Sequence, residues 1–245
     1  MDQKDGVIVL LDSLGTKNRS IRESRDFIKK RDHIVKFVKD YSKDLHLEKR
    51  YGDLVQYTFG DTLLLAFERL NVIGTPLVLL GRLLRYLLVE SMENEGILWR
   101  GALSIGKYIE DERSNTIIGP AVGDAAAWYE AANWFGVICT PHSALVVKRL
   151  FEEMSGSADV VKKLRETFVD YDVPIEGGKA LRVPAIAWPV EMLEKGMTKL
   201  PDGNTTSPLA NLYRILSGFS IPMKTEDKYI NAIAFFKHCQ EQMGE

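Results

Sequence analysis

Residues 7–15 decide the fold and read Val7-Ile8-Val9-Leu10-Leu11-Asp12-Ser13-Leu14-Gly15. Five consecutive aliphatic residues predict a central strand that is buried on both faces, since such a strand needs no alternation of polar and apolar side chains. The Ser and Gly that follow predict a tight turn. Asp12 is therefore expected at the carboxyl end of a central strand.

The next hundred residues predict a compact α/β core. Ser20 to Asp44 has apolar residues at helical intervals after a Ser-x-x-Glu capping box. Leu54–Phe59 and Thr62–Phe67 form a hairpin around Gly60-Asp61, and a Leu-rich helix from Thr75 and Pro76 should run to Gly96, before a strand over Ile97–Ile105. The order strand, helix, strand, strand, helix, strand is that of the ferredoxin-like βαββαβ arrangement. In such a sheet Asp61, at the hairpin tip, can lie beside Asp12.

The rest of the chain predicts further helices and strands around this α+β palm. A loop is expected over 106–116, a helix over Pro120–Phe135 and a strand over Val137–Thr140. Two helices (Pro141–Met154, Ala158–Thr167) and two strands (Val169–Val173, Leu181–Ala187) should follow. A linker-like loop at 196–207 precedes one or two terminal helices. We therefore expect a domain over 1–188 and a helical C-terminal extension over 189–245.

Composition excludes several classes of protein. The formal net charge of −2 arises from 32 basic and 34 acidic residues that are mixed along the chain, so a protein that binds polymeric nucleic acid or anionic lipid is not expected. The N-terminal apolar run is too short for a signal peptide, and the stretch from Val72 to Val89 is broken by Arg82 and Arg85. Cys139 and Cys239 read as reduced thiols. A cytoplasmic protein without a membrane span is expected.

Asp12 and Asp61 are the candidate chemical groups. Two converging carboxylates can hold a pair of Mg²⁺ or Mn²⁺ ions at roughly 3.5–4 Å, the usual way to bind a nucleoside triphosphate. Taken singly, each aspartate could equally be an ordinary turn residue.

Several stretches in the right order resemble the catalytic domain of class III nucleotide cyclases. In that family the first strand ends in a metal-binding Asp, a hairpin carries a Gly-Asp with the second metal ligand, and later segments are an Arg-x-Gly strand, a glycine that opens an Ala-rich helix, and a strand followed by Pro and a helix. The matching segments are Val7–Thr16, Tyr57–Thr62, Gly119–Gly123 and Gly136–Pro141, and Arg100–Gly106 approaches the pattern of the Arg-x-Gly strand. The resemblance covers roughly residues 5 to 188 and implies the ferredoxin-like palm of this family.

The resemblance also implies a site. Asp12 and Asp61 would bind two metal ions, and the backbone amides of Ser13, Leu14, Gly15 and Thr16 would receive phosphate oxygens. A basic residue of a late hairpin, Lys179 or Arg182, would contact the phosphates. The active unit would be a head-to-tail homodimer in which each site takes metals from one chain and base or phosphate contacts from the other.

Departures from the family concern the base and the transition state. Tyr57 stands where purine cyclases have a base-reading Lys or Glu, Thr116 stands near the usual adenine-reading Asp, and Gly123 and Ala127 occupy the places of a catalytic Asn and Arg. An aromatic ring at position 57 would exclude a purine, and the chain resembles the bacterial antiphage (Pycsar) uridylate cyclases. The expectation is a pyrimidine cyclase, with UTP ahead of CTP. The alternatives are an adenylate or guanylate cyclase with an atypical base pocket, or a non-catalytic nucleotide-binding or dimerisation module.

Overall fold

The computed structural model describes residues 3–15, 19–46, 54–68, 75–111, 113–153 and 158–244. The elements of the first half are β1 (Gln3–Ser13), α1 (Ile21–Asp44), β2 (Leu54–Phe59), β3 (Thr62–Glu68), α3 (Thr75–Glu90), the π-helical turn η1 (Ser91–Glu95), β4 (Trp99–Asp111), β5 (Thr116–Ile118) and α4 (Pro120–Trp128). Those of the second half are β6 (Gly136–Cys139), α5 (Pro141–Glu153), α6 (Ala158–Thr167), β7 (Phe168–Ile175), β8 (Lys179–Ile186), α7 (Trp188–Lys195), β9 (Thr198–Lys199), β10 (Thr205–Thr206), α8 (Pro208–Ser217) and α9 (Glu226–Met243).

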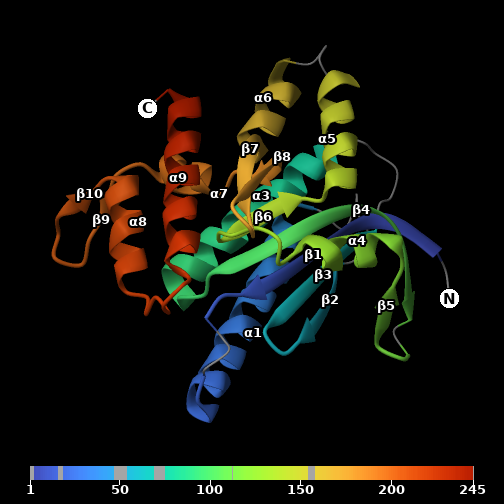
Figure 1. Ribbon diagram of the computed structural model, residues 1–245, viewed down its shortest axis with the longest axis horizontal. Coiled ribbons are helices and arrows are strands. Elements are labelled where there is room, and N and C mark those ends of the chain that lie inside the picture. Colours follow the sequence, from blue (N-terminus) through green and yellow to red (C-terminus); the bar gives the residue numbers. More distant parts are fainter. Residues whose placement is uncertain are drawn as a thin grey trace.

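One mixed sheet organises the molecule, with the strand order β2-β3-β1-β4-β6-β8-β7 and β5 paired to β4 (Figure 1). Its first four strands, joined through α1 and α3, form the predicted ferredoxin-like βαββαβ core. β1 is central and runs antiparallel to both β3 and β4. Asp12 consequently lies opposite Thr62 on one side and opposite Arg100 on the other.

The local signals in the sequence explain the first elements. Ser20 caps α1, its hydroxyl accepting from the Glu23 amide while the Glu23 carboxylate accepts from the Ser20 amide. Gly60 turns the β2–β3 hairpin with φ of 60°, a conformation that disfavours other residues. The predicted helix before Gly96 is α3 followed by η1, and Gly96 ends it in the left-handed conformation.

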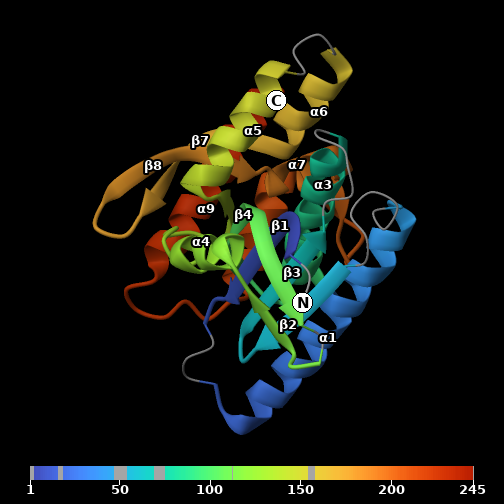
Figure 2. The same cartoon turned by 90° about the vertical axis from the view of Figure 1, so that its right-hand side faces the viewer.

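The sheet separates two apolar clusters, because alternate residues of β1 face opposite sides. Val7, Val9 and Leu11 face the main core, together with side chains of α1 and α3. Ile8 and Leu10 face a smaller cluster with residues of β2, β5 and α4. Figure 2 shows α1 and α3 on one side of the central strands and α4 on the other. By the same alternation, Asp12 belongs to the α4 side.

Two sequence-based boundaries are wrong. The expected loop over 106–116 is mostly strand, because β4 continues to Asp111 and pairs with β1 as far as Gln3 opposite Ile109. The expected helix over Pro120–Phe135 ends at Trp128. The following residues leave the helix because Ala132 forms a β-bridge with Ile175 and Trp134 is fully buried in the main core.

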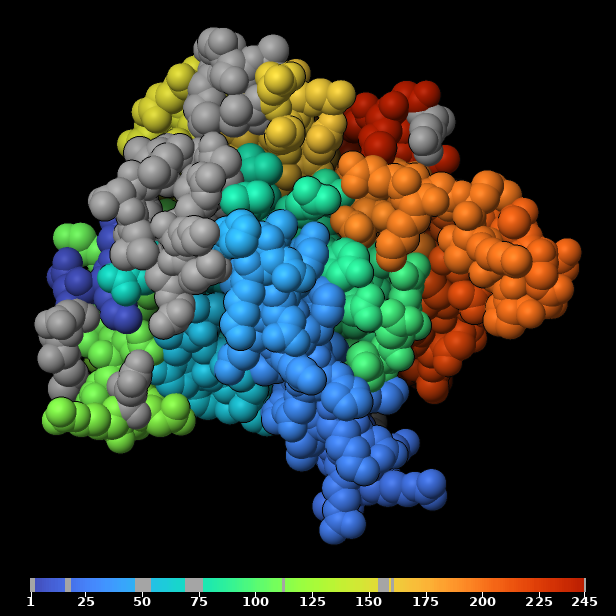
Figure 3. Space-filling model, turned by 180° about the vertical axis from the view of Figure 1, so that it is seen from behind, coloured from blue at the N-terminus to red at the C-terminus, as the bar shows by residue number. Residues whose placement is uncertain are grey.

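The C-terminal segment packs against the rest of the structure through aromatic side chains. The expected linker over 196–207 contains the two-stranded hairpin β9–β10. In α9, Phe235 lies 4.5 Å from Trp134 between ring centroids, and Asn231 Nδ2 donates to the Asn133 carbonyl at 2.8 Å. From behind, α1 lies beside the α3–η1 region, with the segment from α7 to α8 beyond it (Figure 3). The expected division after residue 188 stays a prediction.

No helix in the described ranges is both long enough and apolar enough to cross a bilayer.

Candidate functional site

Asp12 and Asp61 lie together at one end of the sheet. Asp12 is the penultimate residue of β1 and Asp61 occupies the tip of the neighbouring β2–β3 hairpin. The Ser13 amide donates to the Asp61 carbonyl at 3.2 Å, which joins the strand end to the hairpin tip. Arg31 of α1 donates from Nη1 to the Gly60 carbonyl at 3.1 Å and fixes the other side of the tip. The predicted proximity of the two carboxylates thus follows from the strand order.

Arg100 on β4 is the direct partner of Asp12. Its Nε and Nη2 lie 3.1 and 3.0 Å from Asp12 Oδ2. Its Nη1 donates to the Glu130 carbonyl at 3.1 Å, and Nη2 lies 3.2 Å from Glu130 Oε1. Only 8% of Asp12 is exposed, and burying a carboxylate costs free energy. The Arg100 guanidinium, which binds Asp12 through two nitrogens, offsets much of that cost.

Burial raises the pKa of the Asp12 carboxyl above its ordinary value, although the hydrogen bond and charge of Arg100 act to lower this pKa. The nearby negative charge of Asp61 also raises it. Because its ionised form is disfavoured by burial and by Asp61, the Asp12 carboxylate would be stabilised by an additional cation close to it. The electrostatics therefore suit a site that binds positive charge.

A cleft of about 410 Å³ opens over these residues, and we call it the Asp12–Asp61 cleft. The side chains around it come from the β1 end, the hairpin tip, β4, the turn after α4, and the start of α9. They are Asp12, Ser13, Leu14, Gly15, Asp61, Thr62, Arg100, Tyr129, Glu130, Pro222, Thr225, Lys228 and Tyr229. The turn between α8 and α9 accordingly lies beside the carboxyl end of β1 (Figures 1 and 2).

The donor set fits a substrate-bridged Mg²⁺ or Mn²⁺ better than a closed metal cage. No group of three or more His, Cys, Asp or Glu residues suited to a metal occurs in the described ranges. Mg²⁺ is commonly held by one or two carboxylates together with water and substrate phosphates. Asp12 and Asp61 could supply the carboxylates. Ser13, 2% exposed, also lines the cleft, and its hydroxyl has no hydrogen-bond partner among the described residues.

The predicted phosphate contacts of the turn after β1 are only partly compatible with the structure. The amides of Ser13 and Leu14 donate to the carbonyls of Asp61 and Leu98, so the expectation that both receive phosphate oxygens does not fit these bonds. Gly15 lines the cleft, with φ of 78°. Thr16 lies outside the described residues.

Tyr57 and Thr116 do not line the Asp12–Asp61 cleft. Tyr57 is 5% exposed within the smaller cluster, and its hydroxyl donates to Glu110 Oε1 at 3.2 Å. Thr116 starts β5 opposite Asp111, eleven residues further along β4 than Arg100, and donates to the Ser114 carbonyl. Because Glu110 pairs with Ile117 in the β4–β5 ladder, Tyr57 and the start of β5 form one group beside the cleft rather than within it.

Lys179 and Arg182 are likewise separate from the cleft within one chain. Both belong to β8, and both are exposed. Arg182 donates from Nε to Asp170 at 3.1 Å and from Nη1 to Asp172 at 2.9 Å, which raises the pKa of its guanidinium. Two aspartates therefore already neutralise Arg182.

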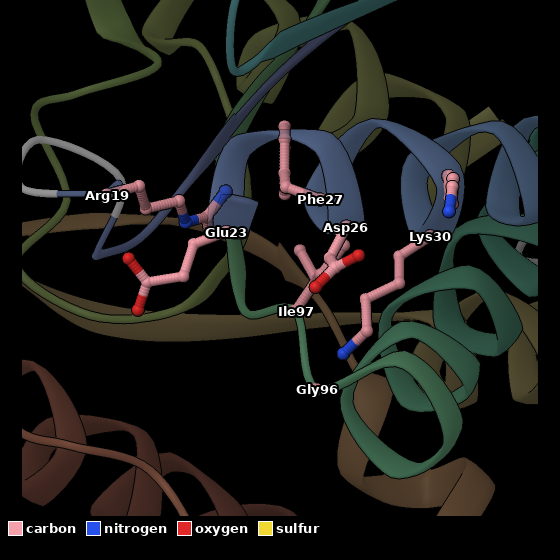
Figure 4. A pocket seen from close by; sticks show the side chains of 8 residues that line it. Arg19, Glu23, Asp26, Phe27, Lys30, Gly96 and Ile97 are labelled. Atoms are coloured by element: carbon pink, nitrogen blue, oxygen red, sulfur yellow. The ribbon is translucent and has the colours of Figure 1, made fainter. Parts of the chain in front are cut away.

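A second cleft, of about 430 Å³, lies beside the start of α1 (Figure 4). The Arg19 guanidinium sits 4.1 Å from the Phe27 ring centroid, and Lys30 Nζ donates to the Glu95 carbonyl at 2.7 Å. These two cations have local partners, and the described residues that line this cleft include no counterpart of the Asp12–Asp61 pair at a strand end. The chemistry favours the Asp12–Asp61 cleft, although the two volumes are similar.

Sequence reasoning missed three charged residues of the cleft: Arg100, Glu130 and Lys228. Arg100 opens the segment Arg100–Gly106, which approaches the Arg-x-Gly strand of the cyclases, and the antiparallel pairing of that strand with β1 could have identified it. Glu130 was placed in a helix that in fact ends at Trp128. For Lys228 the sequence holds no such signal, since its position depends on how a distant helix packs.

Comparison with known proteins finds similarity to solved structures and none at the level of sequence. No protein-family profile and no curated protein matches the sequence. Among solved structures, the chain is similar to a double mutant of the guanylyl cyclase domain of a rhodopsin fusion protein from Blastocladiella emersonii. Identity is 14% over 76% of this chain and 96% of that chain, with a TM-score of 0.49.

Two further solved structures are similar to the chain. For the guanylate cyclase domain from Catenaria anguillulae in complex with GTP, identity is 12%, the shares covered are 76% of this chain and 98% of that chain, and the TM-score is 0.46. For the guanylyl cyclase Cya2, identity is 11%, the shares covered are 76% of this chain and 90% of that chain, and the TM-score is 0.39.

Proposed function

We propose that the protein is a metal-dependent nucleotide cyclase that converts a pyrimidine nucleoside triphosphate, UTP ahead of CTP, to its 3′,5′-cyclic monophosphate and pyrophosphate. One observation carries the proposal: Asp12 and Asp61 meet in a cleft at the end of a ferredoxin-like sheet, beside a buried arginine. The motif resemblance over residues 5 to 188 supplies the reaction type. A role in antiphage defence would accompany uridylate cyclase activity.

The residues of the cleft suit this reaction. In cyclisation the ribose 3′-oxygen forms a bond to the α-phosphorus, the bond from that phosphorus to the pyrophosphate oxygen breaks, and the 3′-hydroxyl proton passes to solvent. Two divalent cations, when bound, would lower the pKa of the 3′-hydroxyl and offset the charge of the phosphates. Asp12 and Asp61 would hold them, and Arg100, buried beside Asp12, is placed to balance charge in the cleft.

The assembly we propose is a head-to-tail homodimer. Tyr57 and Thr116 lie outside the cleft that holds Asp12 and Asp61, so base contacts from these two residues would be made with the nucleotide of a second chain. Lys179 and Arg182 would be contributed in the same way. Exposed apolar side chains next to Tyr57 and Thr116, namely Phe59 at 54% and Ile118 at 55%, are compatible with a contact surface there.

The decisive experiment is incubation of the purified protein with each of the four ribonucleoside triphosphates and Mn²⁺, with mass analysis of the products. Formation of cyclic UMP, absent in Asp61→Asn, is the expected result. Unchanged triphosphates under all four conditions, with metal-dependent nucleotide binding retained, would instead identify a non-catalytic module.

One observation favours a second candidate, a purine cyclase with an atypical base pocket. Tyr57 is packed in the smaller cluster and hydrogen-bonded to Glu110, so its ring does not narrow the Asp12–Asp61 cleft of its own chain. Production of cyclic AMP or cyclic GMP at the rate of cyclic UMP would select this candidate.

A further inference from the structure

The C-terminal helix α9 forms one wall of the Asp12–Asp61 cleft, which the order of motifs along the chain does not indicate. Thr225, Lys228 and Tyr229 face the cleft together with Asp12 and Asp61. These residues are more than 160 positions apart in sequence, so only the packing of α9 brings them together.

Packing fixes the position of this wall. Tyr229 is buried, with its ring 6.4 Å from that of Phe135, and Phe235 and Phe236 are fully buried further along the helix. The turn before α9 is closed by the Thr225 hydroxyl and amide, which both donate to the Pro222 carbonyl. α9 is therefore a preformed part of the cleft.

The described lining of the cleft carries charges of both signs, which suits a polyanion that binds together with metal cations. Among the described residues that line the cleft, three are carboxylates (Asp12, Asp61, Glu130) and two are cationic (Arg100, Lys228), and the charge of Arg19 also acts on Asp61. Arg100 lies against Asp12 and Glu130. Lys228 is the cationic side chain that the described lining contributes from the opposite end of the chain. A triphosphate held by metals at the aspartates would add negative charge toward this wall.

We propose that Lys228 contacts the polyphosphate of the bound nucleotide, so that the C-terminal segment completes the site within its own chain. The inference rests on the proposed function for the identity of the ligand. One observation carries it independently of Lys179 and Arg182: Lys228 lines the same cleft as Asp12 and Asp61, on a helix that buried aromatic side chains hold in place.

The test compares wild-type protein with Lys228→Gln, Lys228→Arg and the matched control Lys237→Gln, an exposed lysine further along α9. Calorimetry measures the binding of inorganic tripolyphosphate with Mn²⁺, and thermal melting checks the fold. Loss of one charge-assisted contact should weaken binding about 10- to 100-fold in Lys228→Gln. Lys228→Arg should stay within a few-fold of wild type, and Lys237→Gln should be unchanged.

A Lys228→Gln protein that melts and binds like wild type would overturn the inference. If wild type cyclises a nucleotide and Lys228→Gln does so with the same KM, the inference fails while the proposed function stands. If no nucleotide is cyclised but tripolyphosphate binding still depends on Lys228, the function fails and the inference stands. Absence of Mn²⁺-dependent tripolyphosphate binding in wild type would overturn both.

Should Lys228→Gln fail to fold, wild-type protein still decides the matter. Acetylation of lysine amines, read by mass spectrometry, should be slowed at Lys228 by Mn²⁺ and tripolyphosphate and remain constant at Lys237. Equal protection or equal labelling at both lysines would overturn the inference.

Discussion

Replacement of Arg100 by glutamine should destabilise the protein in a way that metal repairs. Removing one partner of a fully buried ion pair costs about 3–5 kcal/mol. The Arg100 and Asp12 side chains are 9% and 12% exposed and border a water-accessible cleft, so we expect a smaller loss of about 2 kcal/mol. For a chain of this size, each kcal/mol lowers the melting temperature by about 2–4 °C. The expected decrease is roughly 4–8 °C near neutral pH.

The decrease should depend on pH with a definite sign. Burial already raises the Asp12 pKa in the wild-type fold, and loss of Arg100 removes the group that lowers it, so the pKa of Asp12 in the variant should rise further. The pKa of an unfolded aspartate is near 3.9. A carboxyl whose pKa is higher in the folded state stabilises the fold fully at a pH below the unfolded pKa, and this stabilisation is lost as pH rises through the folded pKa. The variant should therefore approach the wild-type melting temperature as the solution is acidified.

Thermal melting from neutral pH down to about pH 4, with and without Mn²⁺, measures both the pH dependence of the decrease and its repair by metal. Mn²⁺ should raise the melting temperature of Arg100→Gln more than that of wild type, because the ion takes over the charge that Arg100 had balanced. Arg182→Gln is the matched control, since Arg182 also binds two carboxylate oxygens but is exposed, and exposed pairs contribute little. A pH-independent decrease, or equal stabilisation of both proteins by Mn²⁺, would refute the view that Arg100 balances the charge of Asp12.

The remaining predictions concern turnover, base choice and assembly. Asp61→Asn should lower turnover by about a hundredfold or more with an unchanged melting temperature, because it removes one charged ligand of the proposed metal site; near-normal activity would rule out that site. Tyr57→Ala should let ATP and GTP compete better with UTP, whereas a purely structural Tyr57 would lower stability by about 3 kcal/mol and all activities alike. A chain without metal ligands should regain activity when mixed with a chain altered at Lys179 and Arg182, and an active monomer by sedimentation would contradict this.

Local patterns in the sequence were sufficient for the core. The aliphatic run of β1, the capping box at Ser20 and the Gly60-Asp61 turn each specify their element within a few residues, and the order of these elements along the chain is that of the ferredoxin-like sheet, in which Asp12 lies next to Asp61. The turn after Trp128 could not be predicted in this way. Its sequence favours a helix, and tertiary contacts of Ala132 and Trp134 with distant strands and helices override that preference.

The cleft itself depends on the least predictable part of the chain. Its aspartates come from local motifs. Its far wall exists because the aromatic side chains of α9 pack on Trp134, Phe135 and Trp188. Nothing in the sequence near Lys228 indicates that α9 packs against these residues. The proposed metal ligands and the proposed phosphate contact consequently belong to one chain, while Tyr57 and Thr116 lie outside this cleft. A head-to-tail pair would then divide the work by chemistry, with each chain holding the metal-bound polyphosphate in its own cleft and offering base contacts to its partner.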